Sequence, residues 1–423
     1  MTPHRYLRGS AVLAVATIVA LACGGGGGGT TGGATKGEIK VGSDLPTSGA
    51  EASSGLPGQQ GAQFSVQYYM QQHSDGLKGY KLTFVPFDDA VNGVHDPQKG
   101  AQNVQQMVSD PKILGMVGPF NSNVARAEIP IANQNDFTMI SPANTNECLT
   151  QTFDYCNPKP SALRPKGGNN YFRVAAADTF QGPAMADFAV DTLKVTKAAV
   201  WSDNETFGKG VADQFAKEFQ KKGGTVVVRQ DFDWKSTTDF RGFLTKARDG
   251  GATAIYAGAT SPTKGCIPRA QSKGIIDSAF YLGPDGISDT QCIKDAGDMA
   301  NDKMYSTVAA ADAQQNPDAK STVDAYKKAF PKKEDIAAYT FPAYDCGAIL
   351  IDAIGRAIDK NGGKVPTRKQ VVDAVAETKD FKGLTGVYTF DKNGDPTKPT
   401  MAFFQYKDGD WNWVKQFAVG GSS

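Results

Sequence analysis

The sequence predicts an α/β protein of two lobes, each built on a mainly parallel sheet, and three observations support this. Beyond residue 37 the chain alternates short apolar or β-branched runs with longer amphipathic stretches, which is typical of βαβ units. The alternation occurs as two series of similar length, one before and one after about residue 178. A chain of 423 residues has room for two or three domains. We therefore expect two Rossmann-like lobes with a small-ligand cleft between them.

The individual elements follow from hydrophobic periodicity. In the first series it predicts strands at 38–43, 81–87, 113–118, 137–141 and 171–174, and helices at 57–73, 98–109 and 122–134. In the second series it predicts helices at 181–193, 207–221, 238–248 and 262–273, and strands at 197–202, 225–230, 252–258 and 279–283.

The C-terminal part of the chain departs from this alternation of strands and helices. Apolar residues at helical spacing predict a long helix with one buried face, made of Tyr344, Ala348, Ile351, Ile354 and Ile358. Beyond Gly383 the pattern changes to short strands joined by hairpin-type pairs, Asn393-Gly394 and Asp408-Gly409.

The N-terminus has the features of an export signal. Arg5 and Arg8 precede an apolar run at 11–22 that is too short to span a bilayer, so we interpret residues 1–22 as a signal peptide. Cys23 ends this run, and the sequence Leu21-Ala22-Cys23 resembles the lipobox of bacterial lipoproteins, although Ala20 stands where Leu is usual. The resemblance implies a diacylated Cys23 with a glycine-rich tether over 23–37. Plain secretion with cleavage nearby is the alternative.

Charge and motif content exclude several functions. Lys and Arg number 45 against 44 Asp and Glu, which argues against nucleic-acid binding. His73 and His95 both occur in polar turn contexts, so we expect them at the solvated surface rather than in a catalytic or metal site. No G-x-S-x-G, phosphate-loop or CxxC motif occurs. We therefore expect neither an enzyme nor a bound metal or cofactor.

Cysteine usage agrees with export. Cys148 and Cys156 bracket a short polar stretch and form an expected disulfide. Cys266 with Cys292 is the expected second pair, whereas Cys346 lies in the apolar pattern of the long helix and is expected as a buried thiol.

Several stretches, in their order and spacing, make the chain resemble the branched-chain amino-acid-type (Leu/Ile/Val) substrate-binding proteins of ABC transporters. The resemblance runs from about residue 38 to 405 and rests on IKVGSDLPTSG, GLKGYKLTFVPFDDA (76–90), GMVGPFNSNVARAEIPIANQNDFTMISPANTNECLT (115–150), FRVAAADTFQGP (172–183), VWSDNETFGKGVADQF (200–215), YLGPDGISD (281–289) and GLTGVYTFDKNGD (383–395).

This resemblance implies the type I periplasmic binding protein fold, with two lobes joined by three hinge crossings. The crossings carry over to residues 175–178, 306–309 and 384–387. Lobe 1 would then comprise 38–177 with 307–385, and lobe 2 would comprise 178–306 with 386–423.

The resemblance also implies a ligand site. Ser122 follows a strand and opens a helix, where a hydroxyl and free backbone N–H groups can receive a carboxylate, although it could equally be a plain helix cap. By the resemblance, Ala143 and Thr145 serve the same carboxylate, Asp285 pairs with the ligand ammonium, Phe207 stacks on the ligand, and Ser54 lies at the side-chain pocket.

Three departures from the family pattern concern specificity. Phe207 stands where Tyr is usual, Asp285 is one methylene shorter than the more familiar Glu, and Thr260 lies near a position that is often aromatic. These differences suggest a roomier or differently polar pocket, and a polar amino acid, an amide or an aromatic acid remains a candidate ligand.

The resemblance implies an extracytoplasmic, monomeric amino-acid receptor, anchored to the outer face of the membrane, which closes on its ligand and feeds an ABC permease and its ATPase subunits. A sensor of the same fold, which signals to a partner, is the second hypothesis. An exported enzyme is the third, and the missing nucleophile–base set disfavours it.

Overall fold

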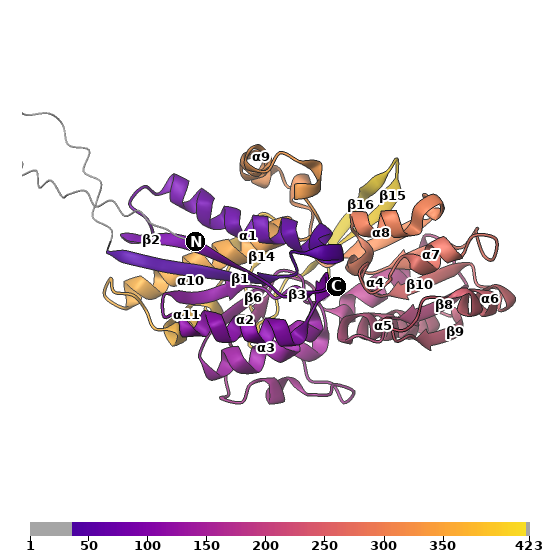
Figure 1. Ribbon diagram of the computed structural model, residues 1–423, viewed down its shortest axis with the longest axis horizontal. Coiled ribbons are helices and arrows are strands. Elements are labelled where there is room, and N and C mark those ends of the chain that lie inside the picture. Colours follow the sequence, from indigo (N-terminus) through magenta and orange to yellow (C-terminus); the bar gives the residue numbers. More distant parts are fainter. Residues whose placement is uncertain (1–35, 420–423) are drawn as a thin grey trace, which may run out of the picture. The chain divides into compact units, whose positions relative to one another are not determined.

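The computed structural model describes residues 36–419, and the predicted signal peptide, Cys23 and most of the tether lie outside this range. The described part contains two main sheets, each covered by helices on both faces (Figure 1). The first sheet is entirely parallel, in the order β2-β1-β5-β6-β7. Its strands are β1 (Gly37–Leu45), β2 (Tyr80–Asp88), β5 (Ile113–Val117), β6 (Thr138–Ser141) and β7 (Tyr171–Arg173).

The second sheet has the order β16-β15-β12-β11-β10-β8-β9, with five parallel strands and an antiparallel hairpin at one edge. The parallel strands are β8 (Lys197–Ser202), β9 (Thr225–Asp231), β10 (Ala254–Gly258), β11 (Phe280–Gly283) and β12 (Met304–Val308). The hairpin strands are β15 (Thr400–Lys407) and β16 (Asp410–Ala418). Two short ladders complete the strands: β3 (Ala90–Val91) with β4 (Val94–His95), and β13 (Phe381–Lys382) with β14 (Val387–Tyr388).

The helices around the first sheet divide between its two faces. On one face, α1, α10 and α11 cover the apolar core that contains Val41, Leu350 and Val375; on the other, α2 and α3 cover the core of Met107, Ile129 and Phe137. These helices are α1 (Ala52–Gln72), α2 (Pro97–Ser109), α3 (Ser122–Gln134), α10 (Thr340–Lys360) and α11 (Arg368–Ala376). Because both faces are covered, β5 and β6 are buried along their whole length, which agrees with the uninterrupted run ILGMV of β5.

The second sheet is enclosed in the same way. Helices α4 and α5 cover one core, while α6, α7 and α8 cover the other. Their bounds are α4 (Asp178–Asp191), α5 (Thr206–Lys221), α6 (Arg241–Asp249), α7 (Ile267–Gln271) and α8 (Thr290–Ala296). A further helix, α9 (Lys320–Ala329), packs beside the first sheet's helices through Tyr326, which contacts Phe64 and Phe341.

The segments that connect the sheets pack against one another. Ala175, Ala176, Val308, Ala309 and Met401 belong to one buried cluster, and the Ala176 amide donates to the Ala309 carbonyl at 2.9 Å. Small side chains allow this close approach of extended backbones. The lobe boundaries drawn from the sequence remain a prediction, although Tyr388 and Phe390, beyond the predicted third crossing, lie in the core of the first sheet.

Most predicted elements are present with shifted ends, and three expectations were wrong in extent. The predicted helix at 262–273 is reduced to α7, because residues 260–265 form turns in which the Thr263 hydroxyl accepts from the Thr260 amide. The long helix α10 buries more than one stripe, since it packs between α1, α11 and the sheet. Asp408-Gly409 is a true hairpin turn, whereas Asn393-Gly394 closes only a turn beside the bridge of Phe390 with Pro396.

Candidate functional site

A cavity lies where the loops after the carboxyl ends of four parallel strands meet. Its lining comes from both sheets: Phe120, Asn121 and Ser122 follow β5, Ala143 follows β6, Thr260 and Pro262 follow β10, and Asp285 and Gly286 follow β11. The remaining lining residues are Glu51, Ser54, Phe207, Ser288, Asp289, Ala337, Ala338 and Tyr339. This is the edge at which α/β sheets bind ligands. The cavity has a volume of about 40 Å³.

Five of the six ligand residues named from the sequence line this cavity: Ser54, Ser122, Ala143, Phe207 and Asp285. The sixth, Thr145, is fully buried but does not line it; the Thr145 carbonyl accepts from the Asp178 amide at 2.8 Å. The assigned roles remain predictions. The sequence analysis did not single out four further lining residues. Asn121 and Asp289 lie within the stretches 115–150 and 281–289 that carry the resemblance, whereas Glu51 and Tyr339 lie in none of the quoted stretches.

The Ser122 side of the cavity is built from the first turn of α3. Asn121 is the N-cap residue, and its side chain makes no cap hydrogen bond; of the first-turn amides, that of Val124 donates to the Asn123 side-chain oxygen at 2.9 Å. The Ser122 hydroxyl accepts from the Asn146 amide at 3.4 Å. A helix N-terminus with a serine hydroxyl beside it is suited to an anionic group.

Asp285 lines the same cavity and is surrounded by neutral donors. Its carboxylate accepts from the Gln181 amide at 3.1 Å and from the Tyr339 hydroxyl, and no cation among the described residues contacts it. Burial raises the pKa of Asp285 to about 6, although these hydrogen bonds oppose the shift. An incoming ammonium group would supply the cation that this carboxylate lacks.

Gly286 allows an aromatic wall beside Asp285. A Cβ atom at Gly286 would lie 2.9 Å from the Phe207 ring and 2.6 Å from the Ala259 carbonyl oxygen. Any larger residue would therefore displace the ring. The half-buried Phe207 is the first-turn residue of α5 that faces the cavity.

Glu51 also lines the cavity, and its carboxylate is already paired with the imidazole of His95. The His95 Nδ1 lies 2.7 Å from Glu51 Oε2, and the Asn121 side-chain amide donates to Glu51 Oε1 at 2.7 Å. Burial alone would raise the pKa of Glu51, but attraction to His95 and the hydrogen bonds outweigh it and leave that pKa lowered. At His95, burial alone would lower the pKa, but attraction to Glu51 outweighs it and leaves the pKa raised.

The expectation that His95 lies at the solvated surface was wrong. The two-residue strands β3 and β4 fold the chain back onto the segment 49–51, and this contact across 44 residues buries His95 to 9 % exposure. His73 is exposed, as expected, and stacks on Tyr69.

Asp289 forms a further buried contact between segments of the two sheets. It accepts from the Ser54 hydroxyl at 3.0 Å, from the Ser261 hydroxyl at 2.8 Å and from the Cys292 amide at 2.8 Å. Burial raises the pKa of Asp289, and the nearby Glu51 carboxylate raises it further.

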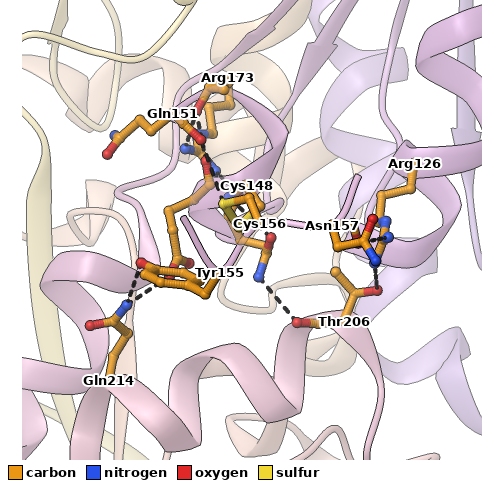
Figure 2. Close-up of a disulfide and its surroundings, with 12 residues drawn as sticks. Arg126, Cys148, Gln151, Tyr155, Cys156, Asn157, Arg173, Thr206 and Gln214 are labelled. Atoms are coloured by element: carbon orange, nitrogen blue, oxygen red, sulfur yellow. Dashed lines mark hydrogen bonds between the residues drawn. A yellow bond between two sulfur atoms is a disulfide. The ribbon is translucent and has the colours of Figure 1, made fainter. Parts of the chain in front are cut away.

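A second set of contacts joins the two sheets through residues 144–157, here called the clasp loop. The loop contains the disulfide Cys148–Cys156, and Figure 2 shows its Tyr155 hydroxyl beside Gln214 of α5, which donates to it at 3.0 Å. Arg126 of α3 donates to the Asn157 carbonyl and to the Thr206 hydroxyl. The other predicted disulfide, Cys266–Cys292, is also present, and Cys346 is a buried free thiol.

A buried ion pair between Arg173 and Asp395 stabilises the clasp loop. Arg173 is fully buried, and its Nε donates to Asp395 Oδ1 at 2.7 Å. The rest of the guanidinium donates to the Asn144 and Asn146 carbonyls and to the Thr150 hydroxyl. Although burial opposes it, the Arg173 charge holds the pKa of Asp395 below its usual value. This network fixes the backbone on both sides of Thr145.

Two findings concern other functional classes. Within residues 36–419, no cluster of three or more His, Cys, Asp or Glu side chains is placed to hold a metal ion. In the same range no helix has the length and apolarity needed to cross a membrane.

The architecture and the cavity define a class of ligand-binding protein with two α/β lobes, and comparison with known proteins identifies the family. A model of the periplasmic binding protein family matches residues 38–410. The chain therefore belongs to the periplasmic binding protein family.

Individual relatives are distant but cover most of the chain. The Leu/Ile/Val-binding protein homolog 3 of Brucella melitensis is 28 % identical over 372 residues, which are 88 % of this chain and 92 % of the relative. The leucine-binding protein LivK of Thermotoga maritima has a similar structure, with a TM-score of 0.75 at 24 % identity, covering 90 % of this chain and 99 % of LivK. The branched-chain amino acid transporter protein LivJ of Streptococcus pneumoniae, solved with isoleucine, gives a TM-score of 0.74, also at 24 % identity, covering 90 % of this chain and 99 % of LivJ.

Proposed function

We propose that this protein is an extracytoplasmic receptor that binds an amino acid or a similar small molecule in the cavity and delivers it to an ABC importer. The observation that carries the proposal is that one cavity is lined both by Asp285, a buried carboxylate that no cation among the described residues contacts, and by Ser122 at the N-terminus of α3. An α-amino acid has a cationic and an anionic group close together, which these two positions complement. The ligands named for the relatives support the same class.

Ligand entry requires the two sheets to move apart. The Ser54–Asp289 and Tyr339–Asp285 hydrogen bonds join the two sides of the cavity and hold it closed. Hinge rotation about the predicted crossings, among them 175–178 and 306–309, would separate these pairs, and a ligand that contacts both sides would favour closure.

A thermal-shift screen of the purified chain against the twenty amino acids and simple amides tests the proposal. We expect one or a few of these compounds to raise Tm, because a ligand that binds only the folded state stabilises it. A flat screen would count against amino-acid binding.

We also propose that Cys23 carries a lipid that anchors the chain to the outer face of the membrane, where it meets the permease and ATPase subunits as a monomer. Its support is the apolar run that ends at Cys23 and the glycines that follow. Labelled fatty acid should enter the wild-type chain and not the Cys23→Ala variant; equal labelling would exclude this anchor.

The same fold could serve a sensor that signals to a partner. A permease gene beside the gene of this protein, and ligand uptake that depends on both, would decide for transport; uptake that persists without this protein would favour the sensor. Turnover of the bound ligand would indicate an enzyme.

A further inference from the structure

Four polar residues that line the cavity, Glu51, Ser54, Asn121 and Asp289, are here called the polar corner. All four residues line the cavity, and two hydrogen bonds link them in pairs: Asn121 to Glu51 at 2.7 Å, and Ser54 to Asp289 at 3.0 Å. The corner is distinct from the surroundings of Asp285, whose partners are Gln181 and Tyr339.

The corner offers hydrogen-bond acceptors and few donors. Because a carboxylate only accepts, the Asn121 amide must present its nitrogen to Glu51, and its oxygen is thereby fixed as an acceptor. That oxygen is buried, in a residue that is 7 % exposed, and it has no partner in the part of the chain that the structure describes. The Ser54 hydroxyl already donates its single hydrogen bond to Asp289, so its oxygen can only accept from a ligand.

The charge of the cavity lining has the same sign throughout. Its ionisable lining residues are Glu51, Asp285, Asp289 and Tyr339, and none of the residues that line it is Lys, Arg or His. His95 is paired with Glu51, but within residues 36–419 no cation contacts Asp289. A second negative group in this corner would therefore meet repulsion, whereas a donor would be attracted.

We propose that the ligand's side chain ends in a hydrogen-bond donor and carries no negative charge, and that the polar corner selects it; this rests on the proposed function. An apolar side chain would leave the Asn121 oxygen buried and unpartnered, which costs free energy that a donor group recovers. Sites that hydrogen-bond a ligand group discriminate strongly against analogues that lack it.

Three near-isosteric amino acids test this by titration calorimetry of the purified chain. L-Asparagine offers a donor, L-leucine is apolar, and L-aspartate carries a carboxylate. We expect asparagine to bind at least about tenfold more tightly than leucine, and aspartate to bind most weakly. Leucine binding as tightly as asparagine would overturn the inference and leave the proposed function standing.

The variant Asn121→Leu should reduce the affinity for asparagine about tenfold and leave that for leucine equal or higher. Asn135→Leu, at the exposed far end of α3, is the matched control and should change neither affinity. If Asn121→Leu does not fold, the wild-type comparison and the Ser54→Ala variant decide, and an unchanged asparagine-to-leucine ratio in Ser54→Ala would contradict the proposal. Failure of all three compounds to bind would overturn it too, whereas the proposed function would fall only with a flat screen of all amino acids.

Discussion

Asp285 and Glu51 line the same cavity, yet their surroundings differ in one respect. Asp285 accepts from neutral groups only, and burial raises its pKa to about 6. Glu51 is paired with His95, whose charge leaves the pKa of Glu51 lowered despite burial. A buried carboxylate with a cation of its own is structural, whereas one without a cation is open to a cationic ligand. The difference favours Asp285 as the proposed ligand-binding carboxylate and Glu51 as a structural one.

The largest expected effect comes from removing the cation of Glu51. His95→Ala leaves a buried carboxylate uncompensated, and we expect the free energy of unfolding to fall by about 3 kcal/mol or more at pH 6. Urea denaturation measures this, and the double variant with Glu51→Gln should recover much of the loss. If the single variant matched the wild type, Glu51 would not depend on His95.

The sign of the pH dependence follows from the two pKa shifts. The contribution of Glu51 is present above its unfolded pKa and is lost as pH falls through its lowered folded pKa. That of His95 is present below about pH 6.5 and is lost as pH rises through its raised folded pKa. The cost of His95→Ala should therefore shrink above that pKa.

The next effect concerns ligand affinity. Asp285→Asn keeps the shape of the side chain and removes the charge that pairs with an ammonium, so we expect about a hundredfold weaker binding of the ligand found in the screen. Calorimetry measures the change, with the exposed Asp298→Asn as control. Equal affinities in both variants would remove Asp285 from the site.

We expect the disulfide of the clasp loop to affect ligand binding rather than the Glu51–His95 pair, because the loop carries Thr145 and contacts α5. Cys148→Ala with Cys156→Ala opens a loop closed over eight residues, which should lower stability by roughly 2 kcal/mol. Ligand affinity should also fall, while the cost of His95→Ala should stay the same. Denaturation and calorimetry of the combined variants test this; a changed cost of His95→Ala would show that the two sides are coupled.

The smallest effect is the pH dependence of binding. A proton on Asp285 removes its charge, so affinity should fall by at most about tenfold per pH unit below about pH 6. Calorimetry at several pH values should show this fall in the wild type and a flat profile in Asp285→Asn. Constant wild-type affinity between pH 5 and 7.5 would mean that the carboxyl does not hold the ligand's cation.

The sequence predicted the fold well, because alternating apolar runs and amphipathic stretches are local features. Strand β5 and helix α3 agree with their predicted ranges to within a residue, since an uninterrupted apolar run and a clear helical periodicity each have a single solution. The helix predicted at 262–273 shrank to α7 because side-chain hydrogen bonds at Thr260 and Thr263 stabilise turns instead.

The cavity was predictable only in part. Ser122 and Asp285 each come shortly after a parallel strand, so the topology places each at the carboxyl edge of its own sheet. Glu51 and His95 are 44 residues apart, and Ser54 and Asp289 are 235 apart. No local pattern encodes such contacts, because each depends on how two distant segments pack.

By itself, the sequence predicted the α/β class, an export signal that lies outside the described residues, the Cys148–Cys156 disulfide, Cys266 with Cys292 as a candidate pair, and the residues that a resemblance could carry over. These depend on residue type, spacing and order along the chain. Only the tertiary structure decided that His95 is buried against Glu51 and that, within residues 36–419, Asp285 has no cation and the Asn121 oxygen has no partner. Burial and pairing are properties of the packed molecule, since the energy of a charge or a polar group depends on what surrounds it in space.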